Sequence, residues 1–218
     1  MKMTKTLATI AVLSTASALS HADFKSYERQ YKVTITNITK GISFTPFIAA
    51  THRHPINVFT LGSPASEEVA RIAEGGDIGP LSEVLNNDRK VFDVESSEGL
   101  LGPGETVTLE LSGKSGRFTL ASMLLPTNDT FVGLSDVRLP RLGKVTYLAD
   151  AYDAGSEMND EYCTNIPGPF CGGAPFSPED AGEGYIYPSP GIHGEGDLSR
   201  ADFNWSGPVA SVTIERVW

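Results

Sequence analysis

The chain has 218 residues and a formal net charge of −10 at pH 7. This excess of acidic side chains argues against nucleic acid and anionic membrane surfaces as partners, because both require basic patches. The same acidity favours solubility and the binding of cations.

The first 22 residues have the features of a signal peptide. Lys2 and Lys5 supply a positive start, an apolar stretch follows, and residues 20–22 (SHA) place small side chains where signal peptidase cleaves. The apolar stretch is too short to span a membrane. We therefore predict a signal peptide over residues 1–22, one domain over residues 23–218, and a secreted or periplasmic protein with no membrane span.

Two strands are predicted at the start of the mature chain. Residues 31–38 (YKVTITNI) alternate apolar with polar side chains and are rich in β-branched residues, which is typical of a strand with one buried face. Residues 42–50 (ISFTPFIAA) predict a second strand. Pro46 indicates an edge position or a bulge there, because proline cannot donate a hydrogen bond to a sheet.

The pattern then changes to helical spacing. Ser63 or Ser66 can cap a helix that carries acidic residues in its first turn and apolar residues at positions 69, 72 and 73. The glycine pair at positions 75–76 ends this helix. A second short helix is predicted at residues 80–85.

From residue 91 onward, short apolar segments alternate with turn residues. They are residues 91–94, 106–111, 118–125, 130–137, 144–148 and 209–217. Seven or more short strands at this spacing predict an antiparallel sandwich or barrel. Residues 151–204 show no regular pattern, and a loop of that length is usually functional or held in place by other contacts.

Residues 148–161 (LADAYDAGSEMNDE) are crowded with carboxylates and contain no lysine or arginine. They are Asp150, Asp153, Glu157, Asp160 and Glu161. The stretch could be a solvated loop, a pair of catalytic acids, or a set of ligands for a hard cation. Ca²⁺ takes about six to eight oxygen ligands from carboxylates, carbonyls and water. Gly155 would let the backbone turn, and Asp129, at a predicted turn between strands, could join from a neighbouring loop.

No sequence motif of an enzyme accompanies these carboxylates. The chain contains no G-x-S-x-G, no H-E-x-x-H and no glycine-rich phosphate loop. A glycosidase would need one carboxylate in an apolar pocket beside another, and no aromatic-rich platform for a sugar surrounds the acidic stretch in the sequence. We therefore expect a protein that is not an enzyme.

The mature chain has three histidines: His52, His54 and His193. On a strand, His52 and His54 would share one face, and His193 lies in a glycine-flanked turn that could approach them. Three imidazoles can bind copper or zinc. The alternative hypothesis is thus a secreted or periplasmic copper or zinc protein, although histidines hydrogen-bonded within loops explain the pattern equally simply.

The two cysteines, Cys163 and Cys171, flank a segment rich in proline and glycine. Export makes a disulfide between them the expected state. Its effect would be local, since it closes a short loop directly after the acidic stretch.

Several stretches together resemble the spondin domain family, in the order in which the family has them. FTPFIAATHRHPINVFTLG (44–62) is similar to an early strand that runs into a histidine, and SPASEEVARIAEGGD (63–77) resembles the helix that follows. SMLLPTNDTFVGLSDVRL (122–139) resembles a strand, turn and strand, although Thr130 and Phe131 replace an Asp-Trp pair. DAGSE (153–157) resembles the family motif D-A-G-T-D, and VASVTIERV (209–217) resembles the closing strand.

This resemblance implies a fold and a set of calcium ligands. The fold would be an antiparallel, mostly β, C2-like β-sandwich with one or two short helices and a long C-terminal loop region. Asp129 and Asp153 match acidic positions of the family and Glu157 keeps the charge, so the resemblance implies these three as ligands of Ca²⁺. Asp150 and Asp160 would support them.

The resemblance also implies a place and a role. Spondin domains occur in extracellular proteins of matrix and adhesion. We therefore expect a secreted, calcium-binding adhesion or partner-binding module whose partner is an extracellular protein or glycan.

Overall fold

The computed structural model describes residues 28–114, 116–176 and 181–217, so the predicted signal peptide lies outside the described residues. Its strands pair antiparallel in the order β4-β3-β6-β7-β8-β10-β1-β5, with β2 on β6 and β9 on β8. The strands are β1 (Arg29–Asn37), β2 (Ser43–Phe44), β3 (Ile48–His52), β4 (Val91–Ser96), β5 (Thr106–Gly113), β6 (Arg117–Leu125), β7 (Thr130–Arg138), β8 (Lys144–Asp153), β9 (Tyr187–Pro188) and β10 (Ala210–Arg216). The prediction of a mostly β, antiparallel fold is confirmed.

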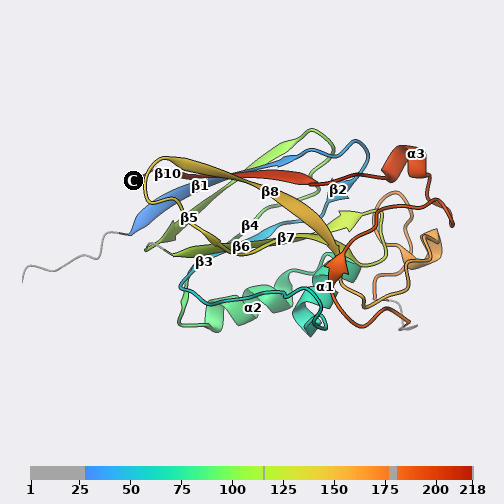
Figure 1. Cartoon of the computed structure of the whole chain (residues 1–218), viewed down its shortest axis with the longest axis horizontal. Helices are drawn as coiled ribbons and strands as arrows, with labels where there is room; N and C mark the ends of the chain where they lie inside the picture. Colours follow the sequence, from blue (N-terminus) through green and yellow to red (C-terminus); the bar gives the residue numbers. More distant parts are fainter. Residues whose placement is uncertain (1–27, 115, 177–180, 218) are drawn as a thin grey trace, which may run out of the picture.

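Strand β8 joins two layers of the sandwich. Its residues 144–149 pair with β10, whereas its residues 150–153 pair with β7. In Figure 1, β1, β5 and β10 lie on one side of the molecule, and β3, β6 and β7 lie on the other. Side chains such as Val33, Phe118 and Leu120 fill the space between the layers and form the main hydrophobic core.

Two helices, α1 (Glu67–Gly75) and α2 (Gly79–Asn87), cover the outer face of the layer that contains β3 and β6 (Figure 1). Ile72 of α1 and Leu81 of α2 pack there against Ala121 of β6. Strand β6 is therefore buried on both faces, which explains why its sequence has no polar alternation.

Helix α1 begins and ends at the capping residues that the sequence predicts. The Ser66 hydroxyl accepts a hydrogen bond from the backbone N–H of Val69, so Ser66 rather than Ser63 is the cap. Gly76 ends the helix in the left-handed conformation, with φ +67°, and its N–H donates to the carbonyl of Ile72.

Two predicted strands differ from the observed ones. The segment 42–50 forms two strands, β2 and β3, because the chain leaves the sheet around Pro46; there the N–H of Phe47 donates to the Ser97 hydroxyl. Strand β8 continues past residue 148 to Asp153, because its last residues pair with both β7 and β9.

The long segment between β8 and β10 packs at the end of the sandwich where β8 ends. It contains a short 3-10 helix (Cys163–Asn165), β9 and α3 (Arg200–Phe203). A disulfide joins Cys163 to Cys171, as predicted, and Ile166, Ile192 and Leu198 form a small core beside it. Among the described residues, none of the helices has the length and apolar character needed to cross a membrane.

Candidate functional site

Three carboxylates, Asp129, Asp153 and Glu157, are buried at this end of the sandwich, and we call them the carboxylate cluster. Their exposed fractions are 0%, 0% and 3%. Asp129 lies in the turn between β6 and β7, Asp153 is the last residue of β8, and Glu157 follows in the next loop. The N–H of Ala154 donates to the Asp129 carbonyl at 3.1 Å, which holds the turn and the end of β8 together.

Within the cluster, backbone N–H groups orient Asp129 but leave one oxygen unused. Oδ2 of Asp129 accepts from the N–H of Ser156 at 2.8 Å and of Glu157 at 3.0 Å. Oδ1 of Asp129 is buried and has no hydrogen-bond partner among the described residues. Asp153 accepts from the N–H of Gly155 at 2.8 Å and from the Asn159 amide at 2.7 Å.

Gly155 shapes the loop that carries these donors. Its φ is +65°, and a Cβ there would lie only 2.4 Å from the Tyr185 carbonyl oxygen. Only glycine accommodates both the positive φ and this close approach. Its carbonyl accepts a hydrogen bond from the N–H of Gly184, so the turn also ties the loop to the segment before β9.

The electrostatics of the cluster disfavour two unneutralised charges. Burial, reinforced by the negative charge of Asp153, raises the pKa of Asp129 to about 8. Burial also raises the pKa of Asp153 to about 6. Among the described residues, no lysine, arginine or histidine forms a salt bridge with either carboxylate. Near neutral pH the pair therefore requires a proton or a cation.

The donor set of the cluster suits a hard cation. A buried, unpartnered carboxylate oxygen beside a second carboxylate is a ligand pair that calcium prefers. Nowhere in the described residues do three or more His, Cys, Asp or Glu side chains form a ready-made metal-binding group. An ion at the cluster would complete its coordination with backbone carbonyl and water oxygens, which calcium readily accepts.

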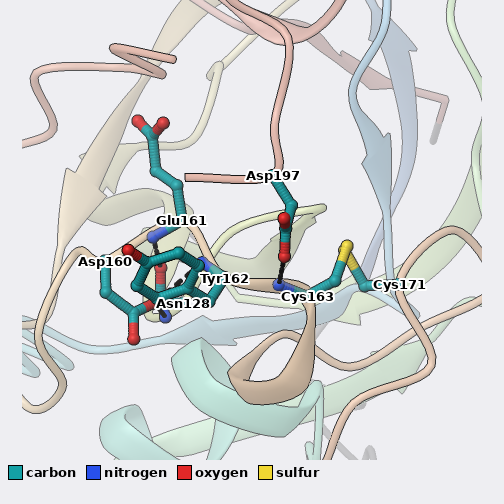
Figure 2. The surroundings of a disulfide bond; sticks show 7 residues. All are labelled: Asn128, Asp160, Glu161, Tyr162, Cys163, Cys171 and Asp197. Atoms are coloured by element: carbon teal, nitrogen blue, oxygen red, sulfur yellow. Dashed lines mark hydrogen bonds between the residues drawn. A yellow bond between two sulfur atoms is a disulfide. The ribbon is translucent and has the colours of Figure 1, made fainter. Parts of the chain in front are cut away.

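The structure does not bring Asp150 and Asp160 to the cluster. Asp150 lies three residues before Asp153 on β8, so its side chain points to the opposite face and is exposed. The Asp160 carboxylate instead accepts from the Asn128 amide at 3.0 Å and from the N–H of Tyr162 at 2.9 Å (Figure 2).

Glu161 has a structural role that its acidic stretch alone does not predict. Its carboxylate is buried, and it accepts from three consecutive backbone N–H groups, those of His193, Gly194 and Glu195. Nearby, Asp197 accepts from the N–H of Cys163 at 2.9 Å (Figure 2). The glycine-rich segment GIHGEG was the available signal, because such segments expose consecutive N–H groups to an anion.

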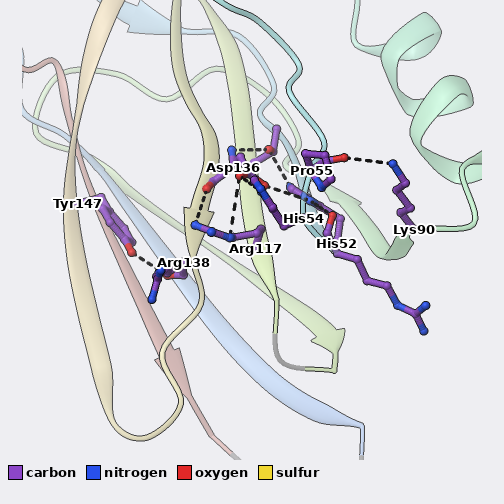
Figure 3. A network of polar contacts seen from close by, with 10 residues as sticks. His52, His54, Pro55, Lys90, Arg117, Asp136, Arg138 and Tyr147 are labelled. Atoms are coloured by element: carbon purple, nitrogen blue, oxygen red, sulfur yellow. Dashed lines mark hydrogen bonds and ion pairs between the residues drawn. The ribbon is translucent and has the colours of Figure 1, made fainter.

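The structure does not gather the three histidines into one group among the described residues. His52 is the last residue of β3 and is fully buried (Figure 3). Its Nδ1 lies 3.1 Å from the Arg53 carbonyl oxygen, which can only accept, so Nδ1 carries the proton. Its Nε2 then accepts from the Thr119 hydroxyl at 3.0 Å. Burial lowers the pKa of His52, which favours this neutral form.

Two of the histidines share a neighbour. Nδ1 of His52 lies 3.9 Å from Oδ1 of Asp136, the carboxylate that His54 also contacts, although β3 ends before His54. The His54 ring is 60% exposed, and its Nδ1 contacts Oδ2 of Asp136 (Figure 3). The backbone N–H of His193 donates a hydrogen bond to the Glu161 carboxylate. The described residues thus contain no group of three imidazoles.

The fold defines an antiparallel β-sandwich module with a disulfide, which fits a secreted protein. The family model Spondin_N matches residues 23–164, which is more than half of the chain. The chain therefore belongs to the spondin N-terminal domain family, and the carboxylate cluster lies within the matched range. No curated protein matches the chain.

Proposed function

We propose that this chain is an exported, non-enzymatic module whose carboxylate cluster binds Ca²⁺, and which binds a protein or glycan partner outside the cell in an adhesion role. Membership of the spondin family supports an extracellular module of this kind. The observation that carries the calcium site is the fully buried Asp129 carboxylate, whose Oδ1 has no described partner although Asp153 lies beside it.

Calcium fits this set of ligands better than other divalent ions do. The cluster offers carboxylate oxygens and no imidazole or thiolate, which disfavours zinc and copper. Magnesium demands a near-ideal octahedral arrangement, whereas calcium accepts the irregular geometry of a loop.

A bound calcium ion would order the loop region that follows β8. It would relieve the repulsion between Asp129 and Asp153 and so fix the turn before β7 against the end of β8. The Asn159 amide donates both to Asp153 and to the Tyr187 hydroxyl, which extends this effect to β9. In this proposal the ion has a structural role and presents a rigid surface to a partner.

Thermal unfolding with and without a chelator tests the proposal. A ligand that binds only the folded state stabilises it by about 2.7 kcal/mol at a hundredfold excess over its Kd. We therefore expect EGTA to lower the Tm of the wild-type protein, and Asp153→Asn to abolish the difference. Asp150→Asn is the matched control, since this exposed carboxylate lies on the opposite face of β8 and should leave the chelator effect intact.

Elemental analysis of the purified protein provides the decisive second measurement. Stoichiometric calcium, lost in Asp153→Asn, supports the proposal. An unchanged Tm in EGTA together with protein free of calcium would refute it, and stoichiometric copper or zinc would instead support the alternative metalloprotein that uses His52, His54 and His193.

A further inference from the structure

A cleft of about 430 Å³ lies on the outer face of β8, away from the carboxylate cluster. Asp150 and Tyr152 line it from the strand. Pro188 and Pro190 form a second side, and the loop before β10 contributes Trp205 and Ser206. The volume is within the range of small-ligand pockets, about 300–1,000 Å³.

The Ser189 hydroxyl in the wall of this cleft is hydrogen-bonded within the protein, but three other polar groups there have no described partner. Within the described part of the chain, the Asp150 carboxylate has no hydrogen-bond or salt-bridge partner, and the same holds for the Tyr152 hydroxyl and the Trp205 indole N–H. Asp150 and Tyr152 lie two residues apart on β8, so their side chains share one face of the strand. Burial, and then the charge of Asp150, raises the pKa of Tyr152. The cleft thus offers an acceptor, a donor, and a group that can be either.

The scaffold holds these groups in place. Asp150 and Tyr152 are paired with Gly133 and Phe131 of β7, and the Tyr152 ring packs against Phe131 with centroids 5.7 Å apart. Trp205 packs partly against the hydrophobic core, so its position is also fixed. A site built on a strand and on partly buried aromatic side chains is pre-organised for binding.

We infer that this cleft is a binding site for a neutral saccharide. A sugar ring has apolar C–H faces that pack against aromatic and proline surfaces. Its hydroxyls both donate and accept, so they can serve the Asp150 carboxylate and the Trp205 N–H together. The cleft volume accommodates about one or two sugar rings.

Other ligand classes match the cleft less well. An acidic glycan would be repelled by Asp150 and by the net charge of −10. An organic cation would satisfy Asp150, but it has no acceptor for the indole N–H of Trp205. The proline and aromatic side chains that line the cleft supply few polar ligands for a bare inorganic ion.

This inference rests on the proposed function only in naming a glycan as the partner, because the cleft itself does not need calcium. The two sites are connected through β9. The Asn159 amide that donates to Asp153 also donates to the Tyr187 hydroxyl, and Pro188, which lines the cleft, is the next residue. Calcium would therefore tighten sugar binding without being required for it.

Tryptophan fluorescence titration and calorimetry test the inference. The probes are the methyl pyranosides of glucose, galactose, mannose and N-acetylglucosamine and the corresponding disaccharides. A Trp218→Phe background leaves Trp205 as the single tryptophan. We expect saturable binding of at least one probe, weakened at least tenfold by Asp150→Asn and by Trp205→Ala in calorimetry. Tyr162→Ala, which removes an exposed aromatic ring outside the cleft, should bind as the wild type does.

The controls separate the sugar site from folding and from calcium. Asp150 is exposed, so Asp150→Asn should keep its Tm even if Trp205→Ala unfolds. The absence of saturable binding by every neutral probe would overturn the inference, as would sugar binding that Asp150→Asn leaves unchanged. Binding of tetramethylammonium in place of the sugars would also overturn it. Sugar binding by protein that is free of calcium and whose Tm EGTA leaves unchanged would refute the calcium proposal alone. A calcium response without sugar binding would refute the sugar site alone.

Discussion

At the scale of single residues, Glu161 joins its own loop to a second loop that is distant in the sequence. Its oxygens accept from the N–H groups of residues 193–195, and its own carbonyl accepts from the N–H of Asp197. We expect Glu161→Ala to lower the free energy of unfolding by about 1–3 kcal/mol, because three N–H groups lose their acceptor. Urea unfolding measures this change. Glu195→Ala removes an exposed carboxylate nearby and should be neutral; equal midpoints for the two variants would contradict the anchoring role.

The raised pKa values of Asp129 and Asp153 predict how stability depends on pH. Their pKa values of about 8 and about 6 lie above the unfolded value of about 3.8. The folded protein therefore binds more protons than the unfolded chain between about pH 4 and pH 8, and its free energy of unfolding falls as pH rises through this window.

We expect the Tm of calcium-stripped protein to fall from pH 5 to pH 8. Saturating calcium should reduce this fall, because the ion replaces the proton at the carboxylates. Differential scanning calorimetry across this range is the measurement, and Asp129→Asn should flatten the profile. A Tm that rises with pH in the stripped protein would show that the two carboxylates are not protonated in the folded state.

The residues of this site could be predicted only in part. The sequence singled out Asp129, Asp153 and Glu157, and the structure buries all three together. Asp150 could not be separated from them, because its place outside the cluster depends on how far β8 continues. Trp205 lies more than 50 positions further along the chain, so its approach to Asp150 depends on loop packing that no local pattern reveals.

At the scale of elements, the disulfide stabilises the segment that follows the carboxylate cluster. Cys163 begins the 3-10 helix, and both cysteines pack beside Ile166 and Leu198. Closing a loop of this length contributes about 2–3 kcal/mol in the chain-entropy model. We expect the Cys163→Ala, Cys171→Ala double variant to lose this amount in urea unfolding, and dithiothreitol to bring the wild type to the same midpoint. Oxidised and reduced wild type of equal stability would contradict the prediction.

Elements whose ends are set by nearby residues in the sequence were predicted correctly. The start and end of α1 follow from Ser66 and from the glycine pair at positions 75–76, since capping is decided within a few residues. The end of β8 was missed, because residues 150–153 (DAYD) carry two acids and become a strand only through pairing with β7 and β9. The break between β2 and β3 was signalled by Pro46, although its size depends on contacts with Ser97 and Met123.

At the scale of the whole molecule, the carboxylate cluster holds the C-terminal loop region to the sandwich, because the N–H of Glu157 donates to Asp129 in the turn between β6 and β7. The Glu161 carboxylate and the Cys163–Cys171 disulfide instead tie parts of this region to one another. The small core around Ile192 is the main apolar contribution within this region. Because polar and covalent contacts dominate there, local opening of this region should cost less free energy than opening of the sandwich core.

Limited proteolysis should detect this difference. The region exposes Tyr162, Phe170 and Tyr185, with exposed fractions of 52%, 60% and 46%, and chymotrypsin cleaves after such residues. Cleavage requires local unfolding, so its rate follows the population of the open form. With calcium bound we expect the region to resist cleavage, and in EGTA we expect cuts at these aromatic residues before any within β1 to β8.

Mass spectrometry of the fragments identifies the order of the cuts. Asp153→Asn should be cleaved at the same rate with and without EGTA, because it lacks the calcium response, whereas Asp150→Asn should behave as the wild type does. Early cuts within the sandwich strands would show that the molecule opens as one cooperative unit. Equal cleavage of the wild type in both conditions, at a calcium concentration that saturates the protein, would show that the ion does not order this region.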